Sequence, residues 1–140
     1  MDSDAPPPET IAYAAGSCNI DPVGRQRRRL VGHLGAIGAI TAAAAVVGLG
    51  MHWAWSLLVL PIATGSALGY LQARRGFCVA FALHGVEASG AADDIRPVAD
   101  PADRARDRAL MRTLLLQAVV LGGTATALVA FVASDACPCG

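Results

Sequence analysis

Two long stretches of the chain contain no charged residue. No Asp, Glu, Lys or Arg occurs in the 44 residues between Arg29 and Arg74, or in the 22 residues between Arg112 and Asp135, of this 140-residue chain. Because an α-helix needs about 20 apolar residues to cross the hydrocarbon layer of a bilayer, the first stretch has room for two spans and the second for one. The predicted helices are Leu30–Gly50, Trp53–Arg74 and Leu110–Ala133.

The predicted fold class is therefore all-α, an integral membrane protein whose first two helices form a tight hairpin. Only Met51 and His52 separate these helices. The first is rich in Ala and Gly and only marginally hydrophobic, which favours insertion of the two as a pair. The predicted segments are a disordered Pro-rich tail and basic flank (1–29), the transmembrane hairpin (30–74), a cytoplasmic interfacial segment and linker (75–109), the third transmembrane helix (110–133) and an outer tail with a Cys-x-Cys motif (134–140).

The arginines predict how these spans are oriented. All eleven cations of the chain are Arg, and ten of them flank the spans in three clusters, at 25–29, 74–75 and 104–112. Since positive charge is retained on the cytoplasmic side, the N-terminus and the loop after the second helix are expected inside. The turn at 50–52 and the C-terminus are expected outside.

Composition and charge argue against three other classes of protein, of which the first is a water-soluble globular domain. The chain is 54 % apolar and only 16 % charged, whereas about a quarter of a soluble protein is charged. Its formal net charge is zero, and no basic face with interleaved aromatic residues lies outside the flanks of the spans, so nucleic acid is not an expected partner. No charged residue lies deep in a predicted span, which argues against a stand-alone ion pump.

The stretch 76–90 is apolar but too short to span a bilayer. Two structures are expected first, a continuation of the second helix or a short interfacial helix with Phe77, Phe81 and His84 on one face. A re-entrant loop is the alternative. Farther along, 91–107 mixes Pro, Asp and Arg and is expected to be a solvated linker.

Small residues at four-residue spacing are predicted to hold the helices together, because helices associate in lipid through close backbone approach. An Ala-rich composition also produces such stripes by chance. Pro61 is predicted to bend the second helix near its middle. Gln72 and Gln117, near the ends of their helices, are expected to form interhelical hydrogen bonds. The packing candidates are Gly35, Ala39 and Ala43 in the first helix, Gly65 and Gly69 in the second, and Ala118 and Gly122 in the third.

The four cysteines are divided by the predicted topology into two pairs. Inside, Cys18 and Cys78 could combine with His33 and His84 to bind a soft or borderline metal ion, since thiolates and imidazoles are suitable ligands. The competing interpretation is that these are independent packing thiols and interfacial histidines. No resident cofactor is expected beyond this soft metal.

Outside, Cys137 and Cys139 form a Cys-Pro-Cys motif in a compartment where exposed thiols tend to be oxidised. An intermolecular disulfide, a thiol-exchange role and capture of a soft metal are the functional alternatives to a plain short tail.

Two strings carry a resemblance to a known group of proteins. Ser17-Cys18-Asn19-Ile20-Asp21-Pro22 precedes the first helix, and Gly69-Tyr70-Leu71-Gln72 leads to Phe77-Cys78 after the second. These strings resemble those of a group of small bacterial inner-membrane proteins with no assigned activity, over residues 16–90. The resemblance implies a multi-pass protein of the bacterial inner membrane, and it draws attention to Cys18 and Cys78.

Three functional hypotheses follow. The leading one is a non-enzymatic accessory or scaffold subunit of a larger membrane assembly, with the lipid bilayer and other membrane subunits, or further copies of the chain, as partners. The second is a thiol-based metal-handling or redox protein that uses Cys18 and Cys78, or Cys137 and Cys139. The third is a small transporter or channel, which three Ala-rich helices could form only as an oligomer.

Overall fold

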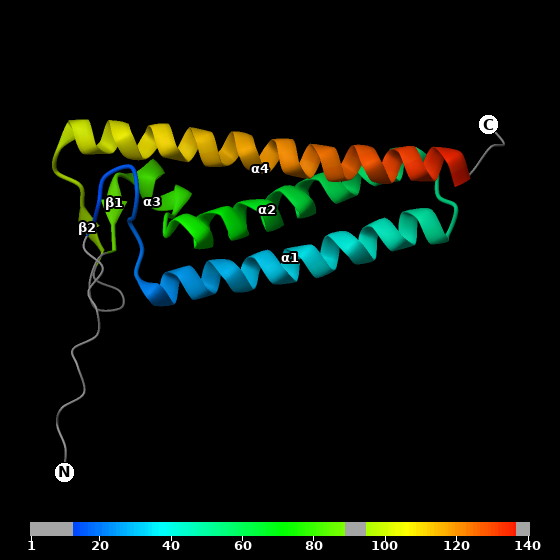
Figure 1. Ribbon diagram of the computed structural model, residues 1–140, viewed down its shortest axis with the longest axis horizontal. Helices are drawn as coiled ribbons and strands as arrows, with labels where there is room; N and C mark the ends of the chain where they lie inside the picture. Colours follow the sequence, from blue (N-terminus) through cyan, green and yellow to red (C-terminus); the bar gives the residue numbers. More distant parts are fainter. Residues whose placement is uncertain (1–12, 89–94, 137–140) are drawn as a thin grey trace, which may run out of the picture.

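Three long helices run along the molecule side by side (Figure 1). The computed structural model describes residues 13–88 and 95–136. Helix α2 (Val59–Arg75) lies between α1 (Pro22–Gly48) and α4 (Pro101–Ala136), and both of these pack mainly against α2. Among the described residues, three helical stretches are long and apolar enough to cross a membrane: Pro22–Gly48, Trp53–Arg75 and Pro101–Asp135. The prediction of three apolar spanning helices is confirmed to this extent.

Helix α1 begins at Pro22, about two turns before the predicted start at Leu30. Asp21 lies at the N-cap position, where its Oδ1 accepts a hydrogen bond from the N–H of Gly24 at 2.8 Å. Pro22 suits the first helical position, because its fixed φ favours the helix and no N–H is needed there. The four arginines predicted as an unstructured basic flank therefore lie on the first turns of the helix.

The second span consists of a 3-10 helix, η1 (Trp53–Leu58), followed by α2. Pro61 lies in the first turn of α2 instead of near the middle of a continuous helix. In a first turn the missing N–H of proline leaves no helical hydrogen bond unmade. The predicted mid-helix bend at Pro61 is therefore replaced by a change of helix type before it.

Helix α4 begins at Pro101, well before the predicted Leu110. The Oδ1 of Asp100 accepts from the N–H of Ala102 at 2.8 Å and so satisfies a donor of the first turn. The Asp- and Arg-rich stretch from Pro101 onward, expected to be part of a solvated linker, is helical.

The stretch after α2 folds back onto one end of the bundle. Gly76 ends α2 in the left-handed region, with φ +64°, so the predicted continuation of the second helix is wrong. It is followed by the short helix α3 (Val79–His84) and by strand β1 (Val86–Glu87), which pairs antiparallel with β2 (Arg96–Pro97). We call residues 13–20, residues 76–87 (which include α3 and β1) and β2 the cap, and the end of the bundle that carries it the arginine-rich end. Figure 1 shows the cap gathered where α1 and α4 begin and α2 ends.

The cap packs its apolar residues against α2 and α4, and it fixes part of the predicted tail. Phe77, Ala82 and Leu114 of α4 are buried against one another. Residues 13–16, assigned by sequence to a disordered tail, are held in the cap, where Ala14 forms a β-bridge with Cys18. The remainder of that predicted tail, 1–12, lies outside the described residues.

Glycines allow α1 and α2 to approach closely. A Cβ on Gly35 would lie 2.9 Å from the Cβ of Ser66, and a Cβ on Gly69 would lie 2.8 Å from the backbone N of Gly32. The hydroxyl of Ser66 donates to the carbonyl oxygen of Gly32 at 2.8 Å across the same contact. Small residues thus replace apolar burial as the source of helix association.

The contact of α4 with α2 uses the same device. A Cβ on Gly122 would collide with the side chain of Thr64 and lie 2.8 Å from its backbone N, and Ala118 is fully buried. Ala39 and Ala43 are half-buried on α1. Gly65 is exposed, and no described residue lies within 4 Å of where its Cβ would stand. The two glycines of the predicted GxxxG pair therefore face different surroundings.

Candidate functional site

Asn19 and Cys78 join the two chain segments that meet in the cap. Asn19 is 1 % exposed and Cys78 is completely buried. The Nδ2 of Asn19 donates to the carbonyl oxygen of Cys78 at 3.1 Å, and its Oδ1 accepts from the N–H of Cys78 at 2.6 Å. The backbone N–H of Asn19 donates to the carbonyl oxygen of Gly76 at 3.1 Å. The segment before α1 is thereby fastened to the segment after α2.

Gln72 shapes the turn that carries Cys78 into this position. Its carbonyl oxygen accepts from the N–H of Phe77 at 3.0 Å, and its Oε1 accepts from the N–H of Val79 at 3.1 Å. The Gln72 side chain, for which an interhelical hydrogen bond was predicted, bonds to the backbone at the start of the short helix α3. Gln117 is exposed on α4.

The two strings that carry the sequence resemblance therefore meet in space. Asn19 of the first string pairs with Cys78 of the second. Asp21 caps α1, and Gly69 provides the closest approach of α2 to that helix. These residues build the junction of α1, α2 and the cap, which gives them a structural role that the separate strings do not reveal.

A second polar contact ties the N-terminal part of the cap to α4. Asp107 is 1 % exposed. Its Oδ2 accepts from the hydroxyl of Tyr13 at 2.9 Å, and its Oδ1 accepts from the N–H of Gly16 at 2.7 Å. Burial and the bond to the Asp107 carboxylate raise the pKa of Tyr13 well above its usual range. The phenol therefore remains a hydrogen-bond donor through neutral and moderately alkaline pH.

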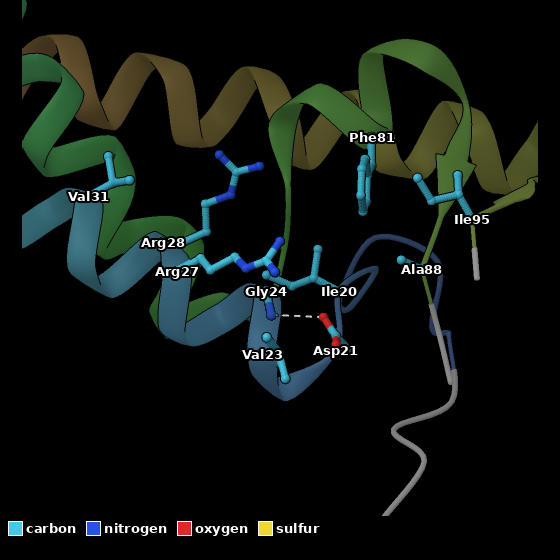
Figure 2. Close-up of a pocket in the computed structure, with 10 residues that line it drawn as sticks. All are labelled: Ile20, Asp21, Val23, Gly24, Arg27, Arg28, Val31, Phe81, Ala88 and Ile95. Carbon is cyan, nitrogen blue, oxygen red and sulfur yellow. Dashed lines mark hydrogen bonds between the residues drawn. The ribbon is translucent and has the colours of Figure 1, made fainter. Parts of the chain in front are cut away.

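A pocket of about 300 Å³ opens between the first turns of α1 and the cap (Figure 2). We call it the cap pocket. In Figure 2 the ring of Phe81 projects into it from α3, opposite the side chains of α1. The lining residues are Ile20, Asp21, Val23, Gly24, Arg27, Arg28, Val31, Phe81, Ala88 and Ile95.

Of the charged side chains that line the cap pocket, two already have hydrogen-bond partners within the chain. Arg28 donates from Nη2 to the Sγ of Cys78 at 2.9 Å, and Asp21 is held as the N-cap of α1. Arg27 forms no hydrogen bond or ion pair with any residue that the structure describes. Guanidinium groups bind carboxylates and phosphates through paired hydrogen bonds, so the pocket suits a small anion with an apolar part.

The four candidate metal ligands do not converge. The structure, over its described residues, contains no group of three or more His, Cys, Asp and Glu side chains able to hold a metal ion. Cys78 is buried against Arg28, Cys18 donates from Sγ to the carbonyl oxygen of Ile20 at 3.6 Å, and His33 Nδ1 lies 2.6 Å from the hydroxyl of Tyr70. His84 is exposed at the end of α3. Cys137 and Cys139 lie outside the described residues.

Several residues that organise this end of the molecule were not among the sequence candidates. Asn19 and Asp107 make the long-range contacts, and Arg28 joins the thiol to the pocket. Asn19 stands inside a string that was singled out, next to Cys18, and this was the available signal. Asp107 resembles its neighbours in an alternating Asp and Arg stretch, where nothing distinguishes a buried carboxylate from a solvated one.

A comparison of the chain with protein families, curated proteins and solved structures finds no match.

Proposed function

We propose that this chain is a non-enzymatic accessory or scaffold subunit of a larger assembly in a bacterial inner membrane, with the cap on the cytoplasmic side. The orientation is supported by the arginines of α1, α2 and α4, which cluster at the cap end of the spans. The bacterial location rests on the resemblance of the two strings before α1 and after α2.

The observation that carries the proposal is how little of the spans the chain itself covers. In the most apolar window of each span only 11 %, 22 % and 17 % of the residues are buried within the described structure. The buried Asn19 of the cap and Asp107 of α4, in contrast, both have hydrogen-bond partners within the chain. A protein built in this way offers a stable end and a large apolar surface on which other membrane helices can pack.

Gly65 marks the part of this surface best suited to another helix. It lies in α2 within the apolar part of the span, beside the exposed Pro61 and Ile62. Because no described residue approaches it, a backbone from outside the chain could come as close here as α1 comes to Gly69. Close approach at glycine is the main route by which membrane helices associate.

The test is the composition of particles extracted into polymer-bounded nanodiscs from membranes of the host cell. Native mass measurement should find the chain with other membrane subunits in a fixed ratio, and Gly65→Leu should release it as a single chain. Gly123→Leu is the matched control, since Gly123 also has no described neighbour within 4 Å, and it should leave the assembly intact. Wild-type particles that hold one chain and lipid only would contradict the proposal.

The cap pocket favours a second candidate function, recognition of a small anion with an apolar part. Two observations support it: Arg27 bonds to no residue that the structure describes, and the ring of Phe81 faces it across the pocket. Medium-chain carboxylates should raise the thermal stability of the wild type in detergent, and Arg27→Gln should abolish that rise without altering the stability of the unliganded protein. Equal stabilisation of Arg27→Gln and wild type would remove this candidate.

A further inference from the structure

An apolar groove runs along the bundle on a different side of α2 from Gly65. Its floor is formed by Ala63 and Ala67 of α2, and Ile40 of α1 and Leu121 of α4 stand on either side. The groove has two adjoining parts of about 450 and 590 Å³, which share Leu71, Arg74 and Leu121. It exists because α1 and α4 pack against α2 and make few contacts with each other.

The two polar side chains that border the apolar part of the groove, Ser66 and Tyr70, are already hydrogen-bonded within the chain. Ser66 borders it, but its hydroxyl donates to the carbonyl oxygen of Gly32 at 2.8 Å. Tyr70 also borders it, and its hydroxyl lies 2.6 Å from Nδ1 of His33. A hydrocarbon chain can therefore lie along Ala63 and Ala67 without burying an unpaired donor.

The end of the groove nearest the cap has the opposite character. Arg74 and Arg75, the last two residues of α2, and Gln117 of α4 line it together. Within the described part of the chain, neither arginine forms an ion pair or hydrogen bond, and all three side chains are exposed. Two guanidinium groups without a partner among the described residues, together with an amide, thus stand at the point where an apolar groove reaches the end of the span.

We propose that this groove binds an acidic phospholipid of the leaflet at the arginine-rich end. The phosphate lies between Arg74 and Arg75 and accepts hydrogen bonds from them and from the Gln117 amide, while one acyl chain lies along Ala63 and Ala67. Basic pockets between membrane helices select anionic headgroups, and guanidinium groups pair well with phosphate. The small side chains of Ala63 and Ala67, with the larger Ile40 and Leu121 on either side, form a groove for the acyl chain that an isolated helix would lack.

Lipid retention measured by native mass spectrometry tests the charge of the site. The purified full-length chain is exchanged between mixed micelles containing phosphatidylglycerol or phosphatidylcholine of identical acyl chains. The wild type should retain one phosphatidylglycerol in preference to phosphatidylcholine, and Arg74→Gln with Arg75→Gln should reduce that preference roughly tenfold. Equal retention of the two lipids by the wild type would overturn the proposal.

Two further variants test the position of the site. Arg29→Gln with Arg108→Gln is the matched control, because it removes two exposed arginines near the same end that do not line the groove. It should keep the preference, and a loss as large as that of the Arg74 and Arg75 variant would overturn the proposal. Ala67→Leu fills the floor and should reduce retention of both lipids, whereas unchanged retention would show that the lipid lies elsewhere.

Discussion

Asn19 and Asp107 are polar side chains that the fold buries almost completely and satisfies through groups far away in the chain. Asn19 pairs with the backbone of Cys78, 59 positions away, and Asp107 binds Tyr13 and Gly16, 94 and 91 positions away. Neither pairing leaves a periodic trace in the sequence. Asn19 could be noticed in advance because it stands next to Cys18, whereas Asp107 could not, and the partners of neither residue could be named from the sequence.

Replacing Asn19 with alanine should destabilise the cap. The substitution leaves the buried N–H and C=O of Cys78 without a side-chain partner, and we expect the free energy of unfolding to fall by about 2 kcal/mol. The measurement is thermal unfolding in detergent of a variant whose sole cysteine is Cys78. The readout is the reaction of that thiol with a fluorogenic maleimide, which reports the unfolding transition. Thr41→Val is the control, because that hydroxyl bonds to Ile37 on the exposed surface, and it should shift the transition little. An Asn19→Ala transition equal to that of the wild type would contradict the role of this pairing.

Replacing Tyr13 with phenylalanine should give a stability difference that depends on pH. The variant lacks the bond to Asp107, so it should be less stable by about 1 kcal/mol at neutral pH. Because the pKa of Tyr13 is raised in the folded state, the contribution of its hydroxyl is fully present below the unfolded value near 10 and is lost as pH rises through the folded value. Unfolding compared from pH 6 to 11 should show a constant difference up to about pH 9 that narrows above pH 10. A difference that grows with alkalinity would contradict this assignment.

At the scale of the elements, the sequence predicted which stretches are helical better than where the helices begin. The apolar stretches begin near Leu30 and Leu110, but the caps at Asp21 and Asp100 start α1 and α4 earlier. Helix geometry continues through polar residues wherever a cap satisfies the first turn. The start of an apolar stretch therefore does not mark the start of its helix, which lies at an Asp-Pro pair in both cases, Asp21-Pro22 and Asp100-Pro101.

The two glycines of α2 should respond in opposite ways to alanine. Gly69→Ala places a Cβ against the backbone of Gly32 and Arg28, which cannot yield without moving α1, and we expect a loss of about 1–3 kcal/mol. Gly65→Ala meets open space and should be neutral or stabilising by up to about 1 kcal/mol, since alanine favours the helix. The detergent unfolding assay compares the pair directly. Equal effects at the two positions would show that the contact of α1 with α2 does not depend on Gly69.

At the scale of the whole molecule, the gaps between charges predicted three spans but not their order side by side. The helix in the middle is the one with two faces for close packing. In α2 one face packs against α1 and another packs against α4. Alanine and glycine are so frequent that small stripes could be drawn on every helix. The groove results from this order, so it could not be predicted from the sequence.

The proposed orientation predicts opposite accessibility at the two ends. In a cysteine-free background, Leu49→Cys places a thiol at an exposed position after α1, and it should react with a membrane-impermeant maleimide in intact spheroplasts. Cys18 as the sole cysteine should react only after the membrane is permeabilised. Labelling of both from the same side would contradict the three-span topology.

The bonds of Tyr13 and Gly16 to Asp107 also bear on how the chain is made. The ribosome synthesises Tyr13 long before Asp107, and it synthesises Cys78, the partner of Asn19, between the two. The bonds of Tyr13 and Gly16 to Asp107 therefore cannot form until α1, α2 and the first turns of α4 have been synthesised. Closure of the cap is therefore a late step of biosynthesis. A chain whose α4 fails to form would leave its N-terminal segment accessible to proteases.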